Sequence, residues 1–285
     1  MKEQMRVEIG LPKLHHQQKL WISTTIALGI LLTLIVISNG LGTTGLTTNL
    51  SQRNLEPSAS HLFGTDWLGR DMFTRTMKGL LLSLKVGLTA GISSVVIASM
   101  MGLAAALTGR TVNRFINWLT DLFLSVPHLV TLLLISFVLG GGAKGIIIGV
   151  ALTHWPALSR VIRAEVMQLQ TAPYVVISRN FGKSQWWIAS RHIIPHLVPQ
   201  IIVGIILIVP HAILHEASIT FLGMGLSPHE PAIGIILSES MRYLSSGMWW
   251  LAVFPGLCLL VVVRTFAMLG ENLKQFVNPQ HAHDK

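Results

Sequence analysis

Two histidines and a glutamate lie inside an otherwise uncharged, apolar stretch of the chain. His211 and His215 are four residues apart, so they would share one face of a helix, and Glu216 follows directly. Ionisable groups within a membrane span are costly and by default mark a pathway or a site. Imidazole suits nickel, zinc and copper, so the pair predicts a transient contact with such an ion. The alternative is that both histidines hydrogen-bond within a helix bundle or face water near the outer end of the span.

A third histidine, His128, follows Pro127 in another apolar run. It is a further candidate for a translocation path. Pro127 predicts a kink, because proline has no backbone N–H and leaves a carbonyl group free. Such a kink either hinges during transport or is static packing, and both interpretations stay open at this point.

The composition indicates that lipid is the solvent for most of the chain. Of its 285 residues, 51% are hydrophobic and only 12% are charged, whereas about a quarter of the residues of a soluble domain are charged. The net charge of +9 does not indicate nucleic-acid binding, because the basic residues are scattered at the ends of apolar runs. The single cysteine, Cys258, excludes an intrachain disulfide and a cysteine-based metal site.

Six apolar runs are candidates for membrane spans, each of which needs about 20 residues to cross the hydrocarbon core. They cover residues 20–41, 86–109, 117–139, 145–159, 197–219 and 249–269. Six spans place both termini on one side, and the distribution of Lys and Arg favours the cytoplasm for that side. The first run lacks a convincing cleavage site, so we expect an uncleaved span. The second is dense in small residues, which predicts a helix packed at the centre of the bundle.

A polar, amphipathic segment separates the fourth and fifth runs. It contains Arg179 and Arg191, Gly182 breaks it into two short helices, and Pro195 is expected to end the second. This pattern resembles the coupling loop of bacterial ABC-importer permeases, which docks onto a cytoplasmic ATPase. The resemblance rests on Tyr174, Val175, Arg179, Gly182, Arg191, His192 and Pro195. The chain departs from the family signature Glu-Ala-Ala, having Val176-Ile177-Ser178 instead.

Residues 61–79 contain a second motif, Gly-Thr-Asp-x-x-Gly-Arg-Asp. Its members are Gly64, Thr65, Asp66, Gly69, Arg70 and Asp71. The carboxylates can form local ion pairs and helix caps with Arg70 and Arg75, and direct contact with a substrate is the alternative. The motif resembles the dipeptide, oligopeptide and nickel permease family, second-permease type. Further matches, among them 216–226 and Asn278-Pro279, extend the resemblance from about residue 61 to residue 279.

The resemblance implies an all-α integral membrane protein with six transmembrane helices, the type I ABC-importer permease fold and cytoplasmic coupling helices. Its expected parts are a cytoplasmic N-terminus at 1–19, a first transmembrane helix at 20–41, an extracytoplasmic segment at 42–80, a core permease domain at 81–272 with a coupling loop at 165–195, and a cytoplasmic tail at 273–285. The expected location is the bacterial or archaeal cytoplasmic membrane, with several spans and both termini inside.

The resemblance also implies partners. They are a homologous second permease, two ATP-binding subunits, an extracytoplasmic substrate-binding protein and membrane lipid, and nucleic acid is not expected. The chain has no G-x-x-x-x-G-K-[ST] phosphate loop, so it should not hydrolyse ATP itself. No cofactor is expected on this chain, because ATP and Mg²⁺ would be bound by the partner subunits.

The cargo depends on how the histidines are interpreted. His211 and His215 favour nickel or another transition metal, free or chelated, since the nickel branch resembles this chain better at the paired histidines. Import of dipeptides or oligopeptides is the alternative. A rival of another class is an ATPase-independent secondary transporter or channel. Such proteins often have inverted repeats or broken helices, and neither is evident in the sequence.

Overall fold

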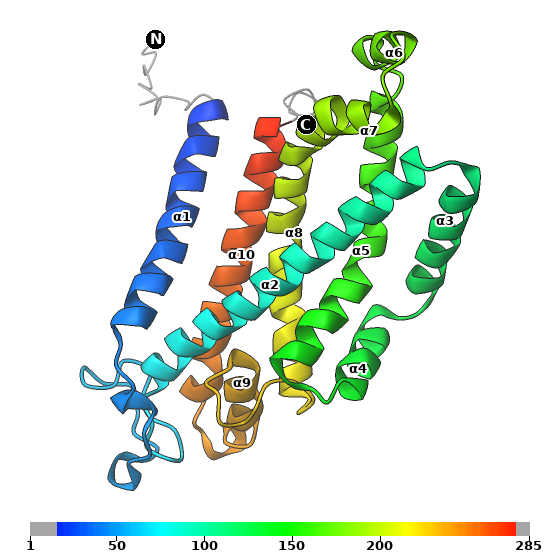
Figure 1. The fold of residues 1–285 in the computed structure, drawn as a ribbon. Helices are drawn as coiled ribbons and strands as arrows, with labels where there is room; N and C mark the ends of the chain where they lie inside the picture. The colour runs from blue at the N-terminus through cyan, green and yellow to red at the C-terminus, as the bar shows by residue number, and fades with distance from the viewer. Residues whose placement is uncertain (1–15, 278–285) are drawn as a thin grey trace, which may run out of the picture.

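The computed structural model describes residues 16–277. Residues 1–15 and 278–285 lie outside the described part, and with them most of the expected N-terminal segment, much of the expected tail and Asn278-Pro279. Within 16–277 the chain is helical, with loops between the helices (Figure 1). The sole β feature of these residues is an isolated bridge between Thr65 and Asp71. The predicted all-α fold is therefore confirmed.

The helices follow one another along the chain with few long connections. They are α1 (His16–Gly40), α2 (Met72–Leu107), α3 (Arg110–Ser125), α4 (His128–Val138), α5 (Gly142–Leu169), α6 (Pro173–Asn180), α7 (Gln185–Ile188), α8 (Ile194–Phe221), α9 (Ile233–Met241) and α10 (Trp250–Val277). Short 3₁₀ turns are η1 (Thr44–Leu46), η2 (Leu50–Gln52) and η4 (Leu244–Ser246), and a π-helical segment, η3 (Ala189–Ile193), joins α7 to α8.

Five helical stretches within residues 16–277 are long and apolar enough to cross a membrane, and α3 with α4 makes a sixth if the pair counts as one broken span. All six predicted runs fall on these elements. The largest difference is at α2, which begins at Met72 and not near residue 86. Lys78 and Lys85 interrupt the uncharged run without interrupting the helix. With 36 residues, α2 is longer than a straight crossing needs, and it lies steeply inclined across the molecule (Figure 1).

The small residues of α2 lie against the neighbouring helices, as the sequence predicts. A Cβ atom added at Gly87 would come within 2.6 Å of Ile213 on α8, and one added at Gly102 would come within 2.9 Å of Ile162 on α5. Real side chains do not approach so closely, so these glycines allow the backbones to pack. α2 therefore holds α5 and α8 in place.

The third predicted span is broken and not merely kinked. α3 and α4 meet at an angle of 96°, with only Val126 and Pro127 between them. Pro127 cannot donate the hydrogen bond that would continue α3, and it drives Val126 into an extended conformation with ψ of 140°. On α3, Asp121 forms an ion pair with Arg160 on α5. The break places His128 at the first turn of α4.

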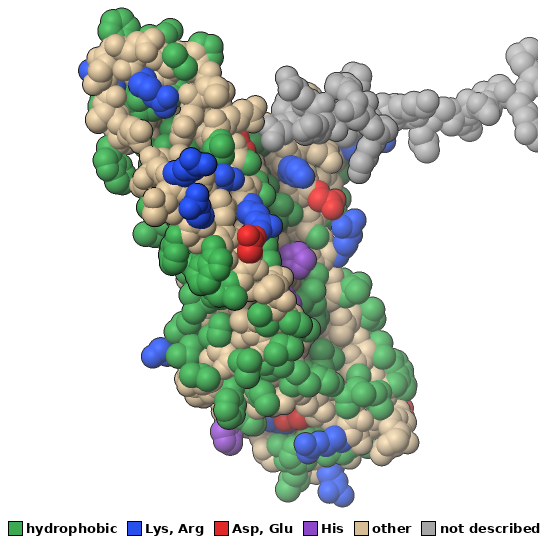
Figure 2. All heavy atoms as spheres, turned by 90° about the vertical axis from the view of Figure 1, so that its right-hand side faces the viewer, with side chains coloured by type: hydrophobic (Ala, Val, Ile, Leu, Met, Phe, Trp, Pro, Cys, Tyr) green, Lys and Arg blue, Asp and Glu red, His purple; other side chains and the backbone are tan. Residues whose placement is uncertain are grey.

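The two ends of the bundle differ. α6 and α7 lie at the end where α1 begins and α10 ends, whereas α9 lies at the opposite end (Figure 1). We call these the α6 end and the α9 end. Between them, hydrophobic side chains form a band across the face shown in Figure 2, and histidine side chains are visible near its upper and lower edges.

Candidate functional sites

Three histidine side chains from three helices meet at one place, which we call the histidine cluster. His128 begins α4, His154 lies near the middle of α5, and His215 lies in the last third of α8. One ring nitrogen of each residue lies within 4.8 Å of the others. The ring centroids are 4.3 Å apart for His128 and His154, 4.9 Å for His128 and His215, and 5.1 Å for His154 and His215. All three side chains are half-buried, so the cluster is partly open to its surroundings.

His154 is the member of the cluster that sequence reasoning missed. It lies in the fourth apolar run, where an ionisable ring is as unusual as those of His128 and His215. That rarity is the signal that singles it out. Spacing does not reveal the cluster, because its members lie 26 and 61 positions apart along the chain and on different helices.

His211 and Glu216, the other predicted path residues on α8, take different positions. His211 is exposed one turn before His215, and it is not among the three clustered residues of the described chain. Glu216 is fully buried, and its Oε1 accepts a hydrogen bond from the Thr220 hydroxyl at 3.0 Å. The carboxylate of Glu216 is therefore part of the packed bundle and does not join the cluster.

The polar segment, residues 173–195, is built as two helical parts around a glycine. α6 ends at Asn180, and Gly182 follows with a φ of +73°, which side chains other than hydrogen disfavour. Beyond the turn, the Ser184 hydroxyl accepts a hydrogen bond from the Trp187 N–H at 3.3 Å and caps α7. The predicted glycine turn between two short helices is confirmed.

His192 joins the two parts of the polar segment. Its Nε2 lies 3.2 Å from the Ser178 Oγ on α6. Its ring packs beside Tyr174 and Trp187, with centroid distances of 5.5 Å and 5.4 Å. Val175 is fully buried beneath them in an apolar cluster. The segment is therefore held both by contacts among its own side chains and by packing against α2 and α5.

Pro195 does not end the second helical part, contrary to expectation. The backbone stays helical from Gln185 through η3 to Phe221. A proline ring clashes with the carbonyl four residues earlier, here that of Arg191, and the wider π turn makes room for it. The polar segment therefore continues into a membrane helix without a loop. Arg179 and Arg191 are both exposed at this end.

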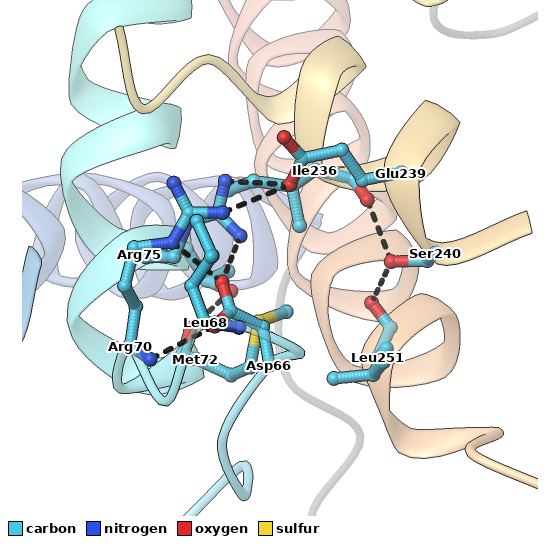
Figure 3. A network of polar contacts seen from close by, with 10 residues as sticks. Asp66, Leu68, Arg70, Met72, Arg75, Ile236, Glu239, Ser240 and Leu251 are labelled. Atoms are coloured by element: carbon cyan, nitrogen blue, oxygen red, sulfur yellow. Dashed lines mark hydrogen bonds and ion pairs between the residues drawn. The ribbon is translucent and has the colours of Figure 1, made fainter. Parts of the chain in front are cut away.

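The Gly-Thr-Asp motif forms a buried ion-pair network at the α9 end (Figure 3). The Asp66 Oδ2 accepts from the Arg70 Nε at 2.7 Å and from the Arg75 Nη1 at 2.6 Å. Both guanidinium groups also donate to the Glu239 Oε2 on α9, at 3.3 Å and 2.9 Å. Asp66 is 2% exposed and Arg75 is 3% exposed. The network fixes the start of α2 against α9.

The other members of this motif shape the turn before α2. Asp71 caps the helix, accepting from the Thr74 backbone N–H at 2.8 Å. Gly64 and Gly69 have φ values of +70° and +73°, and a Cβ atom at Gly69 would overlap the Asn49 carbonyl. Thr65 donates its hydroxyl hydrogen to a backbone carbonyl within the same loop. These contacts favour the capping interpretation of the motif over direct substrate contact.

Comparison with known families decides the class of protein. Residues 94–276 match the family described as binding-protein-dependent transport system inner membrane component. The chain belongs to this family. It is 32% identical over 232 residues to the Dipeptide transport system permease protein DppC of Bacillus subtilis, covering 81% of this chain and 72% of that protein. It is 34% identical over 233 residues to the protein of the same name from Alkalihalophilus pseudofirmus, covering 82% of this chain and 76% of that protein.

A solved structure supports the same fold. A chain of the MetNI methionine ABC transporter, in an inward-facing conformation, aligns with a TM-score of 0.56 and 17% sequence identity. The alignment covers 73% of this chain and 98% of that chain. At this identity the likeness shows the fold alone, which is the type I ABC-importer permease fold.

Family membership makes the chain a multi-pass permease subunit of the inner membrane. Importers of this kind work with ATPase and binding-protein partners, and the ATPase activity lies on separate subunits. The permease is therefore not itself an enzyme, and the rival of an ATPase-independent transporter or channel is wrong. The nickel branch favoured by the histidines is not shown, because the relatives are named dipeptide permeases.

Proposed function

We propose that this permease forms one half of the translocation pathway of an ATP-driven importer of short peptides. The observation that carries the proposal is its relation to two dipeptide transport system permease proteins, each over about four-fifths of this chain. Peptide import replaces metal import as the leading expectation, because the relatives favour it and the paired histidines alone do not outweigh them.

The other half of the pathway would come from a homologous second permease, assembled with two ATP-binding subunits and an extracytoplasmic binding protein. We propose that the polar segment docks onto an ATP-binding subunit. Phe181 and Trp186 are 79% and 82% exposed there, and Arg179 and Arg191 lie on the same segment. Large aromatic side chains left in water in this way are typical anchors of protein interfaces. This docking would put the α6 end in the cytoplasm and the α9 end outside.

The route from the docking segment to the pathway would be α8. The backbone from Gln185 to Phe221 is one helical run, so it joins the polar segment to His215 without a flexible connection. ATP-driven movement of the partner subunits would then reorient α8 and alternate the access of the pathway.

Import of a transition metal, free or chelated, is the second candidate. The specific observation in its favour is the histidine cluster, which gathers three imidazole rings within the membrane-spanning part of the molecule. In this proposal the ion passes His215 and its partners on its way through the permease pair.

The two candidates are separated by uptake in cells that express every subunit of the transporter, with cells lacking this permease as the control. Uptake of a radiolabelled dipeptide that needs the permease and is not reduced by excess nickel would support peptide import. Uptake of radioactive nickel that needs the permease and ignores excess unlabelled dipeptide would assign the metal instead. Uptake of neither cargo above the control would sink both proposals.

A further inference from the structure

The geometry points to a binding site for a divalent transition-metal ion of the nickel, zinc and copper class, formed by His128, His154 and His215. The three residues come from α4, α5 and α8, and their ligand nitrogens all lie within 4.8 Å of one another. Zinc–imidazole bonds of about 2.0–2.1 Å in tetrahedral geometry would bring the nitrogens to about 3.3 Å apart. Rotation of the half-buried side chains would have to close a remaining distance of up to about 1.5 Å.

The nitrogens of the cluster are prepared to act as ligands. The His154 Nδ1 lies 3.1 Å from the Val150 carbonyl oxygen, which can only accept a hydrogen bond. The proton therefore sits on Nδ1, and the Nε2 lone pair is free to bind a metal. A carbonyl that holds one ring nitrogen in this way is the usual support behind a metal-ligating histidine. It orients the ring and fixes the tautomer.

His128 supplies a second sign that the site takes a ligand. Its Nε2 is buried and has no hydrogen-bond partner among residues 16–277. A buried polar atom without a partner is costly, and native structures rarely leave one without a reason. Coordination of a metal ion would satisfy this nitrogen together with those of His154 and His215.

Simple aromatic packing does not account for the cluster. The rings do pack at tilted or edge-to-face angles of 50° to 86°. Phenylalanine would fill the same space without placing polar nitrogens between membrane helices, where they are expensive. No hydrogen bond joins the three rings to one another within the described chain. Packing makes no use of the lone pairs on the imidazole nitrogens of the three histidines, which could bind a metal ion.

Three imidazole nitrogens also determine which metal ions can bind and how many coordination positions stay open. Imidazole nitrogen suits nickel, zinc and copper, whereas magnesium and calcium prefer oxygen. Three protein ligands leave coordination positions open, as in metal sites that exchange their fourth ligand. An ion held there would keep water, or a carboxylate or amine of a small chelating molecule, in the open positions. The site rests on the three side chains alone and does not depend on a peptide cargo.

The test is metal binding by the complete transporter, purified with all its subunits and stripped with a chelator. Equilibrium dialysis against nickel chloride gives the affinity, and the absorption spectrum of bound cobalt(II) reports imidazole coordination independently of transport. His154→Phe keeps a ring of similar size and is expected to weaken nickel binding at least ~10-fold. His196→Phe is the matched control, because His196 is exposed on the same helix as His215 but lies outside the cluster.

A second variant guards against loss of folding. His215→Gln keeps a polar side chain and is expected to lose the cobalt spectrum while the subunits still co-purify. Unchanged nickel affinity in both cluster variants, or an equal loss in His196→Phe, would overturn the site. Failure of dipeptide uptake would remove the proposed cargo and leave this binding measurement unaffected, so the two proposals fail separately.

Discussion

The Arg75 guanidinium on α2 donates to the Glu239 carboxylate on α9 at 2.9 Å, which joins two residues 164 positions apart in the sequence. Arg75 is almost fully buried and also holds Asp66. The start of α2 and the short helix α9 are therefore linked by the guanidinium groups of Arg75 and Arg70, which both donate to Glu239. The charged residues of the Gly-Thr-Asp motif therefore have a structural role, which is to join α2 to α9.

Loss of this link should destabilise the permease. Arg75→Met would leave Asp66 and Glu239 with Arg70 as their one shared guanidinium, and breaking a buried ion pair costs up to about 3–5 kcal/mol. We expect a lower midpoint of thermal unfolding and less assembled transporter in the membrane. Arg53→Met is the control, since Arg53 is exposed in the same loop region. An unfolding midpoint equal to that of the control would contradict the role of the network.

Gly182 should matter for its backbone conformation and not for space. Its φ is +73°, and a Cβ atom added there would meet nothing within 4 Å. Gly182→Ala is expected to cost about 1–2 kcal/mol locally and to weaken binding of the ATP-binding subunits, because it distorts the polar segment. Gly247→Ala imposes the same strain at the α9 end, with a φ of +84° and open space. Equal co-purification of the ATP-binding subunits with both variants would count against this prediction.

Trp186 should be an anchor for the ATP-binding subunit. It lies on α7 and is 82% exposed, so removing its ring changes little inside the permease. Truncating an interface anchor typically costs 2 kcal/mol or more of binding, about 30-fold in affinity. We expect Trp186→Ala to reduce ATPase-subunit binding by that order in a pull-down titration. Trp249→Ala, an exposed tryptophan near the α9 end, is expected to bind as the wild type does.

Gly102 should be required for the packing of α2 against α5. A side chain there would collide with Ile162 and with the Ser159 carbonyl, both at 2.9 Å. Gly102→Val is expected to destabilise the bundle by about 1–3 kcal/mol. Gly29→Val on α1 has no atom within 4 Å of the added Cβ and serves as the control. Thermal unfolding of both variants in detergent measures the difference, and a Gly29 variant as unstable as the Gly102 variant would disprove the packing argument.

The spans and the polar segment could be predicted because each depends on residues close together in sequence. Apolar runs located every membrane helix, and Gly182 located the turn in the polar segment. The start of α2 could not be located in this way, because Lys78 and Lys85 interrupt the run of uncharged residues but not the helix, which begins at Met72. Pro195 was misjudged because a π turn, which has no simple sequence signature, accommodates its ring.

The candidate site was only partly predictable. His128 and His215 stood out because ionisable rings are rare in apolar runs, and the same criterion applies to His154. Their meeting depends on the 96° break at Pro127 and on the close approach of α2 to α5 and α8. For the ion-pair network at the α9 end, only the contacts among Asp66, Arg70 and Arg75 could be predicted. Glu239 joins the network from α9, which lies outside the motif.

The unbroken run from Gln185 to Phe221 has a mechanical consequence. Within this run, α8 carries His215 21 residues after its first residue, Ile194, which at 1.5 Å per residue is a lever arm of about 32 Å. Tilting α8 by about 10° about its Ile194 end would displace His215 by roughly 5.5 Å. That displacement exceeds the 4.8 Å within which the three histidine nitrogens now lie. A tilt of this size is therefore large enough to separate His215 from His128 and His154 and to release a ligand bound between the three rings.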